Sequence, residues 1–415
     1  MSKENIAGSS HSEKFIDVRK LLAELSVEEL NRTAEEYFAS LGNWDFHLSK
    51  PFGAVDETPH LLIAFAVTLQ GLRLAPGMRV LEFGAGSAWA SRFLNQLGCE
   101  VVALDVSKTA LQIGEELYRR HPVIGDKPAP HFLQFDGYTI ELPDASVDRV
   151  LCLDAFHHVP NTRRVLAELS RVLVQGGIAG FSEPGPQHSI SPESQYEMRK
   201  FKVVENDIVI EDIWRDAQEA GFTDIKLAVF NVPFFQLGLT EFTEFLNGGA
   251  AGTRYLESVR EFMQNQRNFF LYKGKETARD SRHRRGLSAE LSIDFESHVI
   301  NEVDVIAARV SVTNNGTAVW LPSGSQLGAV YLGCHLYDAA DKRELQHDYH
   351  WEPLAPPEIA RSILPQETVA FEMKLPAPPA GCYVLEFDLV SHGIGWFALY
   401  GSEVARVQLE VRAAP

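Results

Sequence analysis

Four residues in the middle of the chain carry side chains that could take a proton from a reacting group. They are the adjacent pair His157 and His158, then Glu183 and His188. Imidazoles and carboxylates are the usual general bases of enzymes. Each has a structural alternative, because a histidine can fix a loop by bonding to backbone and a glutamate can hold a turn. No spacing among them demands a metal ion, so we expect none.

A glycine-rich segment upstream could bind a ligand through its backbone. The run from Val80 to Trp89 passes from apolar residues through an acid to two closely spaced glycines, Gly84 and Gly86. This pattern is typical of a strand that ends in a tight turn and opens a helix, where backbone can approach a ligand closely. Nineteen residues after Gly86, a second apolar run ends in Asp105. An acid there can bind the two hydroxyls of a ribose, so the pattern predicts a nucleoside-containing cofactor.

The residues around the two glycines disfavour a dinucleotide. Trp89 occupies the position of the third glycine in the dinucleotide fingerprint. Glu82 lies two residues before the first glycine, where a carboxylate suits a positively charged ligand better than a diphosphate. We therefore expect a cationic nucleoside such as S-adenosyl-L-methionine (SAM), which carries a sulfonium and an ammonium group.

The predicted elements bring these residues to one edge of a sheet. Strands and helices alternate from residue 78 to residue 272, which predicts a doubly wound, mostly parallel α/β sheet. In such sheets the ligand crevice lies at the carboxyl ends of the strands. Strands are expected at 78–83, 100–104, 131–135, 148–153, 177–182, 223–230 and 267–272. Helices are expected at 87–97, 107–120, 161–174 and 209–220.

Further segments flank this alternation. Residues 1–14 are polar and are expected to form a disordered tail. Residues 15–41 predict one helix, 42–59 an irregular aromatic segment, and 59–74 a second helix, which together would cap the sheet. Helical periodicity returns at 234–266, whereas the polar residues 187–194 are expected to form a loop.

Composition excludes several classes of partner. A chain of 415 residues with 45% hydrophobic content fits a globular protein of two domains. The net charge of −18 argues against a nucleic-acid partner. No apolar run approaches the roughly 18 residues that a membrane helix needs. Four cysteines without metal-site spacing and an N-terminus without an apolar signal core favour a cytoplasmic protein.

Four motifs, in this order, resemble class I SAM-dependent methyltransferases across residues 60–275. They are the glycine segment 82–88, Asp105, residues 135–137 and residues 154–159. The resemblance implies a methyltransferase domain at 15–275 with seven strands, the last one antiparallel. It also implies a set of cofactor contacts: Glu82, Gly84 and Gly86 at the methionine end, Asp105 at the ribose, Asp136 and Gly137 at the adenine, and Leu153 and Asp154 at the sulfonium.

From residue 289 onward the helix signals stop. Residues 276–288 are polar and basic and are expected to form a linker, and the short alternating strands of 289–415 predict a β-sandwich. Segments 312–320, 330–333 and 381–397 resemble, more loosely, immunoglobulin-like domains of bacterial surface-polysaccharide proteins. The resemblance implies a glycan partner. Trp351 lies in a polar run and is expected to stack on sugar, whereas Trp320 and Trp396 are expected in the core.

Together these features predict a SAM-dependent methyltransferase that O-methylates a sugar hydroxyl in bacterial surface-glycan biosynthesis. Methyl transfer from a sulfonium requires a positioned acceptor and, for a hydroxyl, a proton acceptor. One alternative is a small-molecule O- or N-methyltransferase whose sandwich mediates homo-oligomerisation. The other is a non-catalytic glycan-binding protein with a SAM fold. The expected acceptor wall contains the following residues: Tyr37, Trp44, Phe46, His60, Tyr196 and Phe201.

Overall fold

The computed structural model describes residues 15–230, 234–275, 277–325 and 327–414. The contacts within the chain divide it into two units, Met1–Glu276 and Thr277–Pro415. The tail expected at residues 1–14 lies outside the described residues. None of the helices in the described part of the chain is long and apolar enough to cross a membrane.

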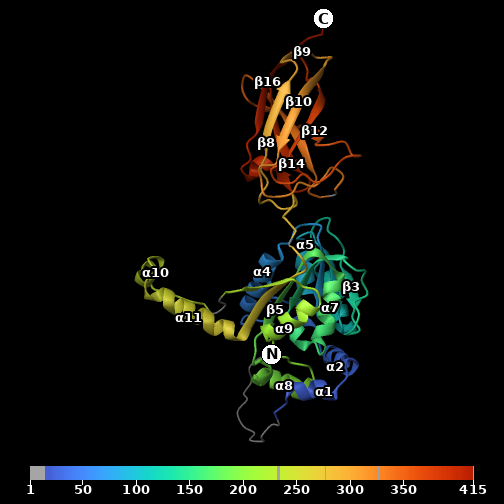
Figure 1. Ribbon diagram of the computed structural model, residues 1–415, viewed down its shortest axis with the longest axis vertical. Helices are drawn as coiled ribbons and strands as arrows, with labels where there is room; N and C mark the ends of the chain where they lie inside the picture. Colours follow the sequence, from blue (N-terminus) through green and yellow to red (C-terminus); the bar gives the residue numbers. More distant parts are fainter. Residues whose placement is uncertain (1–14, 231–233, 276, 326, 415) are drawn as a thin grey trace. The chain divides into compact units, whose positions relative to one another are not determined.

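The first unit is built on a seven-stranded sheet with the order β3-β2-β1-β4-β5-β7-β6. Two of its strands, β3 and β5, are labelled in Figure 1. Its strands are β1 (Arg79–Phe83), β2 (Glu100–Asp105), β3 (His131–Gln134), β4 (Val147–Leu153), β5 (Leu173–Pro184), β6 (Asp224–Ala228) and β7 (Gln266–Tyr272). β1 pairs in parallel with β2 and β4, whereas β7 pairs antiparallel with β5 and β6. The predicted seven-stranded, mostly parallel sheet is confirmed.

Helices cover both faces of this sheet. One face is covered by α4 (Thr58–Leu72), α5 (Trp89–Gln96) and α6 (Lys108–Arg120), and the other by α7 (Thr162–Val172) and α9 (Ile210–Glu219). Leu94 of α5 and Ile113 of α6 are buried in one apolar cluster. Leu166 of α7 and Ile213 of α9 are buried in a second cluster. The two clusters hold the strands fixed, so that their carboxyl ends can position side chains.

The N-terminal segment differs from the single helix expected at 15–41. It forms α1 (Val18–Glu24) and α2 (Val27–Ala39). Ser26 begins the second helix: its hydroxyl accepts from the Glu29 N–H at 3.2 Å, and the Glu29 carboxylate accepts from the Ser26 N–H at 2.8 Å. This reciprocal capping box satisfies two backbone donors that would otherwise lack partners, so the chain restarts the helix there.

Two further helices lie where irregular chain was expected. They are α3 (Asp45–Leu48) and α8 (Pro192–Phe201). The Ser191 hydroxyl accepts from the Ser194 N–H at 3.1 Å, and Pro192 occupies the first helical position, where its missing N–H costs nothing. The helical periodicity at 234–266 corresponds to α10 (Leu239–Leu246) and α11 (Ala250–Asn265).

The second unit is built mainly from β-strands. It contains β8 (Glu290–Phe295), β9 (Val299–Asn301), β10 (Val305–Thr313), β11 (Val330–Asp338), β12 (Glu344–Pro353), β13 (Thr368–Pro376), β14 (Gly381–Ser391), β15 (Gly395–Trp396) and β16 (Ala405–Arg412). One sheet has the order β13-β10-β8 and the other β12-β11-β14-β16-β9, with β15 paired to β14. Only β16 and β9 pair in parallel among these described strands.

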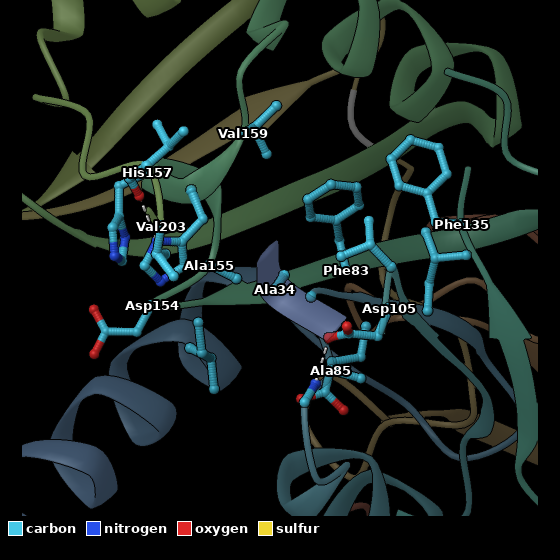
Figure 2. Close-up of a pocket in the computed structure, with 18 of the residues that line it drawn as sticks. Ala34, Phe83, Ala85, Asp105, Phe135, Asp154, Ala155, His157, Val159 and Val203 are labelled. Atoms are coloured by element: carbon cyan, nitrogen blue, oxygen red, sulfur yellow. Dashed lines mark hydrogen bonds between the residues drawn. The ribbon is translucent and has the colours of Figure 1, made fainter. Parts of the chain in front are cut away.

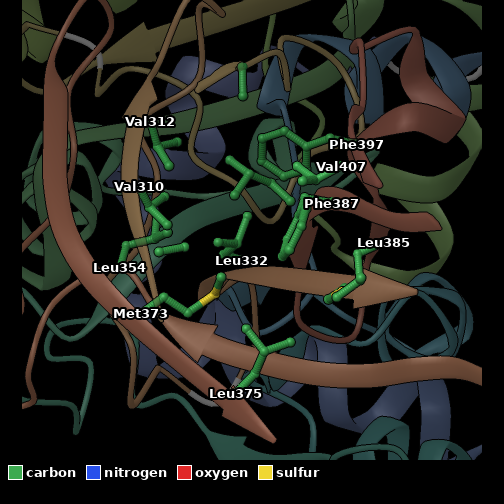
Figure 3. Close-up of a cluster of buried hydrophobic side chains, with 14 of the residues drawn as sticks. Val310, Val312, Leu332, Leu354, Met373, Leu375, Leu385, Phe387, Phe397 and Val407 are labelled. Carbon is green, nitrogen blue, oxygen red and sulfur yellow. The ribbon is translucent and has the colours of Figure 1, made fainter. Parts of the chain in front are cut away.

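The two sheets of the second unit share one apolar core. Val310 and Met373 from the three-stranded sheet point toward Leu332 and Phe387 from the other sheet (Figure 3). Of the two tryptophans expected in this core, Trp320 is fully buried there, whereas Trp396 is only partly buried and lies outside the cluster. Both sheets therefore bury one face, which explains the alternation of apolar and polar residues along their strands.

The stretch expected as a linker packs into the second unit instead. The Ser281 side chain is fully buried, its hydroxyl donates to the Gly328 carbonyl, and its own carbonyl accepts from the Ser391 hydroxyl at 2.6 Å. Leu287 is buried in the core. Ser281 thus satisfies its hydrogen bonds within the protein, which composition alone could not indicate.

Candidate active site

A cavity of about 490 Å³ opens at the carboxyl ends of β1, β2 and β4. It is lined by the turn after β1, by Asp105 at the end of β2, and by Leu153 and Asp154 at the end of β4. Asp105 and Ala85 lie on one side of the cavity, and Asp154 and His157 lie on the other (Figure 2). Both its volume and its place at the strand ends are those of a small-molecule or cofactor site.

The two glycines of the turn differ in what surrounds them. Gly84 has a φ of +68°, and a Cβ on it would lie 2.3 Å from the Cβ of Ala155. Gly86 has a φ of +52°, and a Cβ on it would meet no atom within 4 Å. Gly84 therefore allows the turn to pack against the loop after β4. Gly86 borders open space, into which a ligand can come close to the backbone.

Two buried carboxyl groups stand beside this turn. Glu82 is only 3% exposed, and it accepts hydrogen bonds from the Ser91 N–H at 2.7 Å and from the Ser91 hydroxyl. Burial raises the pKa of Glu82 to about 7. Asp105 accepts from the N–H groups of Gly86 and Ser107, each at 2.8 Å, and burial raises its pKa as well. Burial thus disfavours ionisation of both groups, so a cationic ligand would stabilise their charged forms.

The next predicted contact, Asp136, is placed differently from its neighbours. Its carboxylate accepts from the N–H groups of Tyr138 and Thr139 at 2.7 and 2.8 Å and so closes its own turn. Among the described residues, Phe135 and Gly137 line the cavity and Asp136 does not. An Asx-type turn of this kind orients the Gly137 backbone without bringing the carboxylate into the site.

Glu183 is a buried residue that holds the loop after β4 in place. It is fully buried, and its carboxylate accepts from the N–H groups of Ala155, Phe156 and His157 at 3.2, 2.9 and 3.2 Å. It also bonds to Nδ1 of His157 at 2.7 Å. Burial by itself would raise the pKa of Glu183, but the bonds to His157 and to backbone lower it overall. Its oxygens are fully engaged within the protein, so this carboxylate holds the short helix η1 (Phe156–His158) in place.

Three histidines surround a second buried carboxylate, Glu205, which the sequence analysis did not single out. Its oxygens lie 2.7 Å from Nε2 of His188, 3.5 Å from Nδ1 of His158 and 3.9 Å from Nε2 of His157. Burial by itself would raise the pKa of Glu205, but the hydrogen bond from His188 and the nearby imidazoles lower it overall. The structure thus brings the predicted histidines together around an acid from the segment after α8.

The pKa values of His157 and His158 are shifted in opposite directions. Burial opposes ionisation of His157, but the Glu183 hydrogen bond and charge raise its pKa overall. Burial and the neighbouring His157 lower the pKa of His158. Nδ1 of His158 lies 2.7 Å from the Val204 carbonyl, which can only accept, so Nδ1 carries the proton and Nε2 carries the lone pair. His158, whose side chain is 41% exposed, is therefore a neutral imidazole able to accept a proton.

The cluster also has the residue types of a metal site. Ligand atoms of His157, His158 and Glu205 lie within 4.8 Å of one another, as do those of Asp154, His157 and Glu183. The Nδ1 atoms of His157 and His158 already bond to Glu183 and to the Val204 carbonyl. These bonds leave Nε2 of His158 as the ring atom that can accept a proton.

The expected acceptor wall is present only in part. Of its six predicted residues, Tyr37 and His60 line the cavity. Among the described residues, the lining leaves out these four: Trp44, Phe46, Tyr196 and Phe201. The N-terminal segment adds His47 and Lys50, and α8 adds Glu197. Burial lowers the pKa of His47 to about 4, so this wall presents a neutral imidazole.

Comparison with known proteins agrees with this geometry. A family model described as a methyltransferase domain matches residues 81–181. A demethylmenaquinone methyltransferase of Renibacterium salmoninarum is 34% identical over 136 residues, which cover 32% of this chain and 53% of that protein. A sterol 24-C-methyltransferase of Gibberella zeae is 33% identical over 203 residues, covering 44% and 52%. The chain thus spans about half the length of these two curated relatives.

Solved structures also align with the chain. A Haemonchus contortus phosphoethanolamine N-methyltransferase aligns with a TM-score of 0.42 and 16% identity over 61% of each chain. A cyclopropane synthase of Mycobacterium tuberculosis aligns with a TM-score of 0.42 and 15% identity over 60% of this chain and 99% of its own.

The family match runs from Leu81 in β1 to Phe181 in β5, and so it contains the glycine turn, Asp105 and the His157–His158 pair. Residues 81–181 of the first unit therefore match a methyltransferase domain.

Proposed function

We propose that SAM binds in this cavity across the ends of β1, β2 and β4. Its methionine end lies at Glu82, Gly84 and Gly86, and its ribose hydroxyls bond to Asp105. Its adenine lies against the turn of Asp136 and Gly137, beside Phe135, and its sulfonium faces Leu153 and Asp154. The open space beside Gly86 and the two buried carboxyl groups near it support this placement, because they suit a ligand that carries positive charge.

The reaction we infer is O-methylation, with His158 as the general base. The acceptor oxygen attacks the SAM methyl carbon in line, the carbon–sulfur bond breaks to leave S-adenosylhomocysteine, and the hydroxyl proton passes to Nε2 of His158. The observation that carries the proposal is the 2.7 Å contact between Nδ1 of His158 and the Val204 carbonyl, which leaves Nε2 as the free nitrogen of this ring in the cavity that also contains Asp105.

The remaining candidate bases have positioning roles in this proposal. Glu183 holds His157 and the backbone of η1, and Glu205 holds His188 at 2.7 Å. The rings of His157 and His158 lie 3.9 Å apart between centroids, so any movement of His157 would displace His158. The network thus keeps the base in one orientation, which a transfer over a short distance requires.

We propose a sugar hydroxyl of a bacterial surface glycan as the acceptor and an immunoglobulin-like sandwich as the fold of the second unit. Trp351 is 36% exposed, and its ring lies 5.8 Å from both Tyr331 and Trp396. An exposed indole beside other aromatic rings offers a flat apolar surface on which a sugar ring can stack. Such a surface would let the second unit bind a glycan.

The test is transfer of labelled methyl from SAM to a panel of surface glycans, nucleotide sugars and small hydroxyl or amine acceptors. We expect label in a glycan hydroxyl, at least about 100-fold less transfer with His158→Ala, and weaker glycan use with Trp351→Ala. Transfer to small acceptors alone, unaffected by Trp351→Ala, would favour the small-molecule enzyme with an oligomerising sandwich. SAM binding without transfer to any acceptor would favour the non-catalytic glycan-binding protein.

A further inference from the structure

The strand pair β11–β12 of the second unit contains an irregularity that gathers two histidines and an aspartate. Cys334 pairs with His350 and Leu336 pairs with Gln346, so one residue of β11 faces three residues of β12 between these pairs. The residue of β11 is His335, and those of β12 include His347 and Asp348. Bulges of this kind re-aim side chains, and here Asp348 adopts a φ of +52°.

The side chains gathered by this bulge have the geometry of a small coordination site. One ligand atom from each of His335, His347 and Asp348 lies within 4.8 Å of the other two. Nε2 of His347 is 3.9 Å from the Asp348 carboxylate, too far for a hydrogen bond. In a tetrahedral zinc site with bonds near 2.1 Å, ligand atoms lie about 3.4 Å apart. The three side chains would therefore need to move only slightly closer together to bind an ion.

Each of these three side chains is also held by a neighbour. Nδ1 of His347 lies 2.6 Å from the Glu344 carboxylate, which leaves Nε2 for a ligand. The Trp351 indole N–H donates to the Asp348 carboxylate at 3.2 Å. His335 is buried, and its Nδ1 accepts from the Asp348 N–H at 3.4 Å. Outer partners of this kind, a carboxylate behind a histidine above all, orient the ligands of metal sites.

We propose that His335, His347 and Asp348 bind a divalent transition-metal ion such as Zn²⁺. Two imidazoles and one carboxylate form a donor set that suits zinc and its neighbours better than Ca²⁺ or Mg²⁺, which prefer oxygen ligands. The rings of His335 and His347 face each other with centroids 4.3 Å apart, an arrangement that a shared cation would stabilise. The lone pair on Nδ1 of His335, which accepts from the Asp348 N–H at 3.4 Å, would turn to the ion on binding.

The site is independent of the methyl-transfer cavity, but it bears on the surface around Trp351. Trp351 donates to Asp348, and the Trp396 ring lies 4.3 Å from His335 between centroids. A bound ion would therefore fix the bulge and, with it, the orientation of these two tryptophans.

The test is calorimetry of Zn²⁺ binding to the full chain after treatment with a chelator, with Co²⁺ absorption as a second readout. We expect one Zn²⁺ per chain, loss of binding with His347→Ala, and roughly tenfold weaker binding with Glu344→Gln. His347 is exposed, so its variant leaves the core unchanged. His350→Ala is the matched control, because His350 lies on the same strand and pairs with Glu352 at 2.9 Å instead; it should bind Zn²⁺ like the unmodified chain.

Two results would overturn the proposal. The first is the absence of Zn²⁺ and Co²⁺ binding to the full chain at micromolar to submillimolar concentrations. The second is binding that His347→Ala leaves intact and Glu205→Gln removes, which would place the ion at the histidine cluster of the first unit. Neither result depends on methyl transfer, so the proposed reaction is tested separately.

Discussion

The affinity for SAM should depend on pH through Glu82. Burial raises the pKa of this carboxyl from 4.5 to about 7, so the empty site takes up a proton below neutrality. A shift of about 2.5 pKa units corresponds to about 3 kcal/mol of unfavourable ionisation. In the proposed complex the SAM ammonium group lies beside Glu82, where it would favour the charged form and thereby lower the pKa of Glu82. SAM binding and proton release are therefore linked.

The size of the effect follows from this linkage. If SAM binds only the ionised form, half of the sites are competent at pH 7 and about 3% at pH 5.5, so affinity falls about fifteenfold between these values. The α-amino group of SAM stays largely protonated over the same range, because its usual pKa is near 8. The affinity for SAM therefore decreases as the pH falls through 7.

The assay is isothermal titration of SAM into the full chain between pH 5.5 and 7 in two buffers of different ionisation enthalpy, which also reports protons released. Glu82→Gln is the control, because its neutral amide cannot titrate. We expect this variant to bind SAM more weakly at pH 7 and with an affinity that varies less than twofold with pH. An affinity of the unmodified chain that stays flat, or a pH dependence that Glu82→Gln retains, would refute the reasoning.

Three further predictions concern the same cavity. Glu183→Gln, which breaks the buried pair with His157, should lower the free energy of unfolding by about 3–5 kcal/mol in urea denaturation. His158→Ala should lower kcat at least about 100-fold while calorimetry shows unchanged SAM affinity. Gly84→Ala, with its Cβ 2.3 Å from a neighbouring atom, should destabilise the chain more than Gly86→Ala, which meets no atom within 4 Å and costs about 1–2 kcal/mol.

Each of these predictions has a contradicting outcome. A Glu183→Gln variant as stable as the unmodified chain would show that the carboxylate does not hold the loop after β4. A full kcat in His158→Ala would remove this residue from the reaction. Equal stability of the two glycine variants would mean that the contact of Gly84 with Ala155 is relieved by a shift of the loop.

The parts of the fold that the sequence predicts are those set by local pattern. Apolar runs bounded by glycine and proline mark the strands of the first unit, and all seven lie close to their expected positions. The break between α1 and α2 was missed, although Ser26 and Glu29 have the spacing of a capping box. The packing of the stretch expected as a linker was missed for another reason. Ser281 is polar, and its hydrogen-bond partners Gly328 and Ser391 lie far from it in the sequence.

In the candidate site, too, some residues could be predicted from local sequence motifs and others could not. The glycine turn, Asp105 and the histidine pair could be found because short motifs contain them, and the cavity brings them together. Glu205 could not be found, because no local pattern distinguishes it from other exposed-looking acids and only the packing of its segment places it among three histidines. The role of Glu183 likewise depends on burial, which a strand-end position does not reveal.

The central claim is that SAM binds with its ribose on Asp105. The most direct test is calorimetric titration of S-adenosylhomocysteine, which shares that ribose, into the full chain and into Asp105→Asn. We expect one site per chain, with affinity reduced at least about tenfold by Asp105→Asn, because a charge-assisted hydrogen bond to a ribose hydroxyl is weakened. Asp136→Asn, whose carboxylate lies outside the cavity lining, is the control and should bind normally. Absence of binding, or equal binding by Asp105→Asn, would contradict the account.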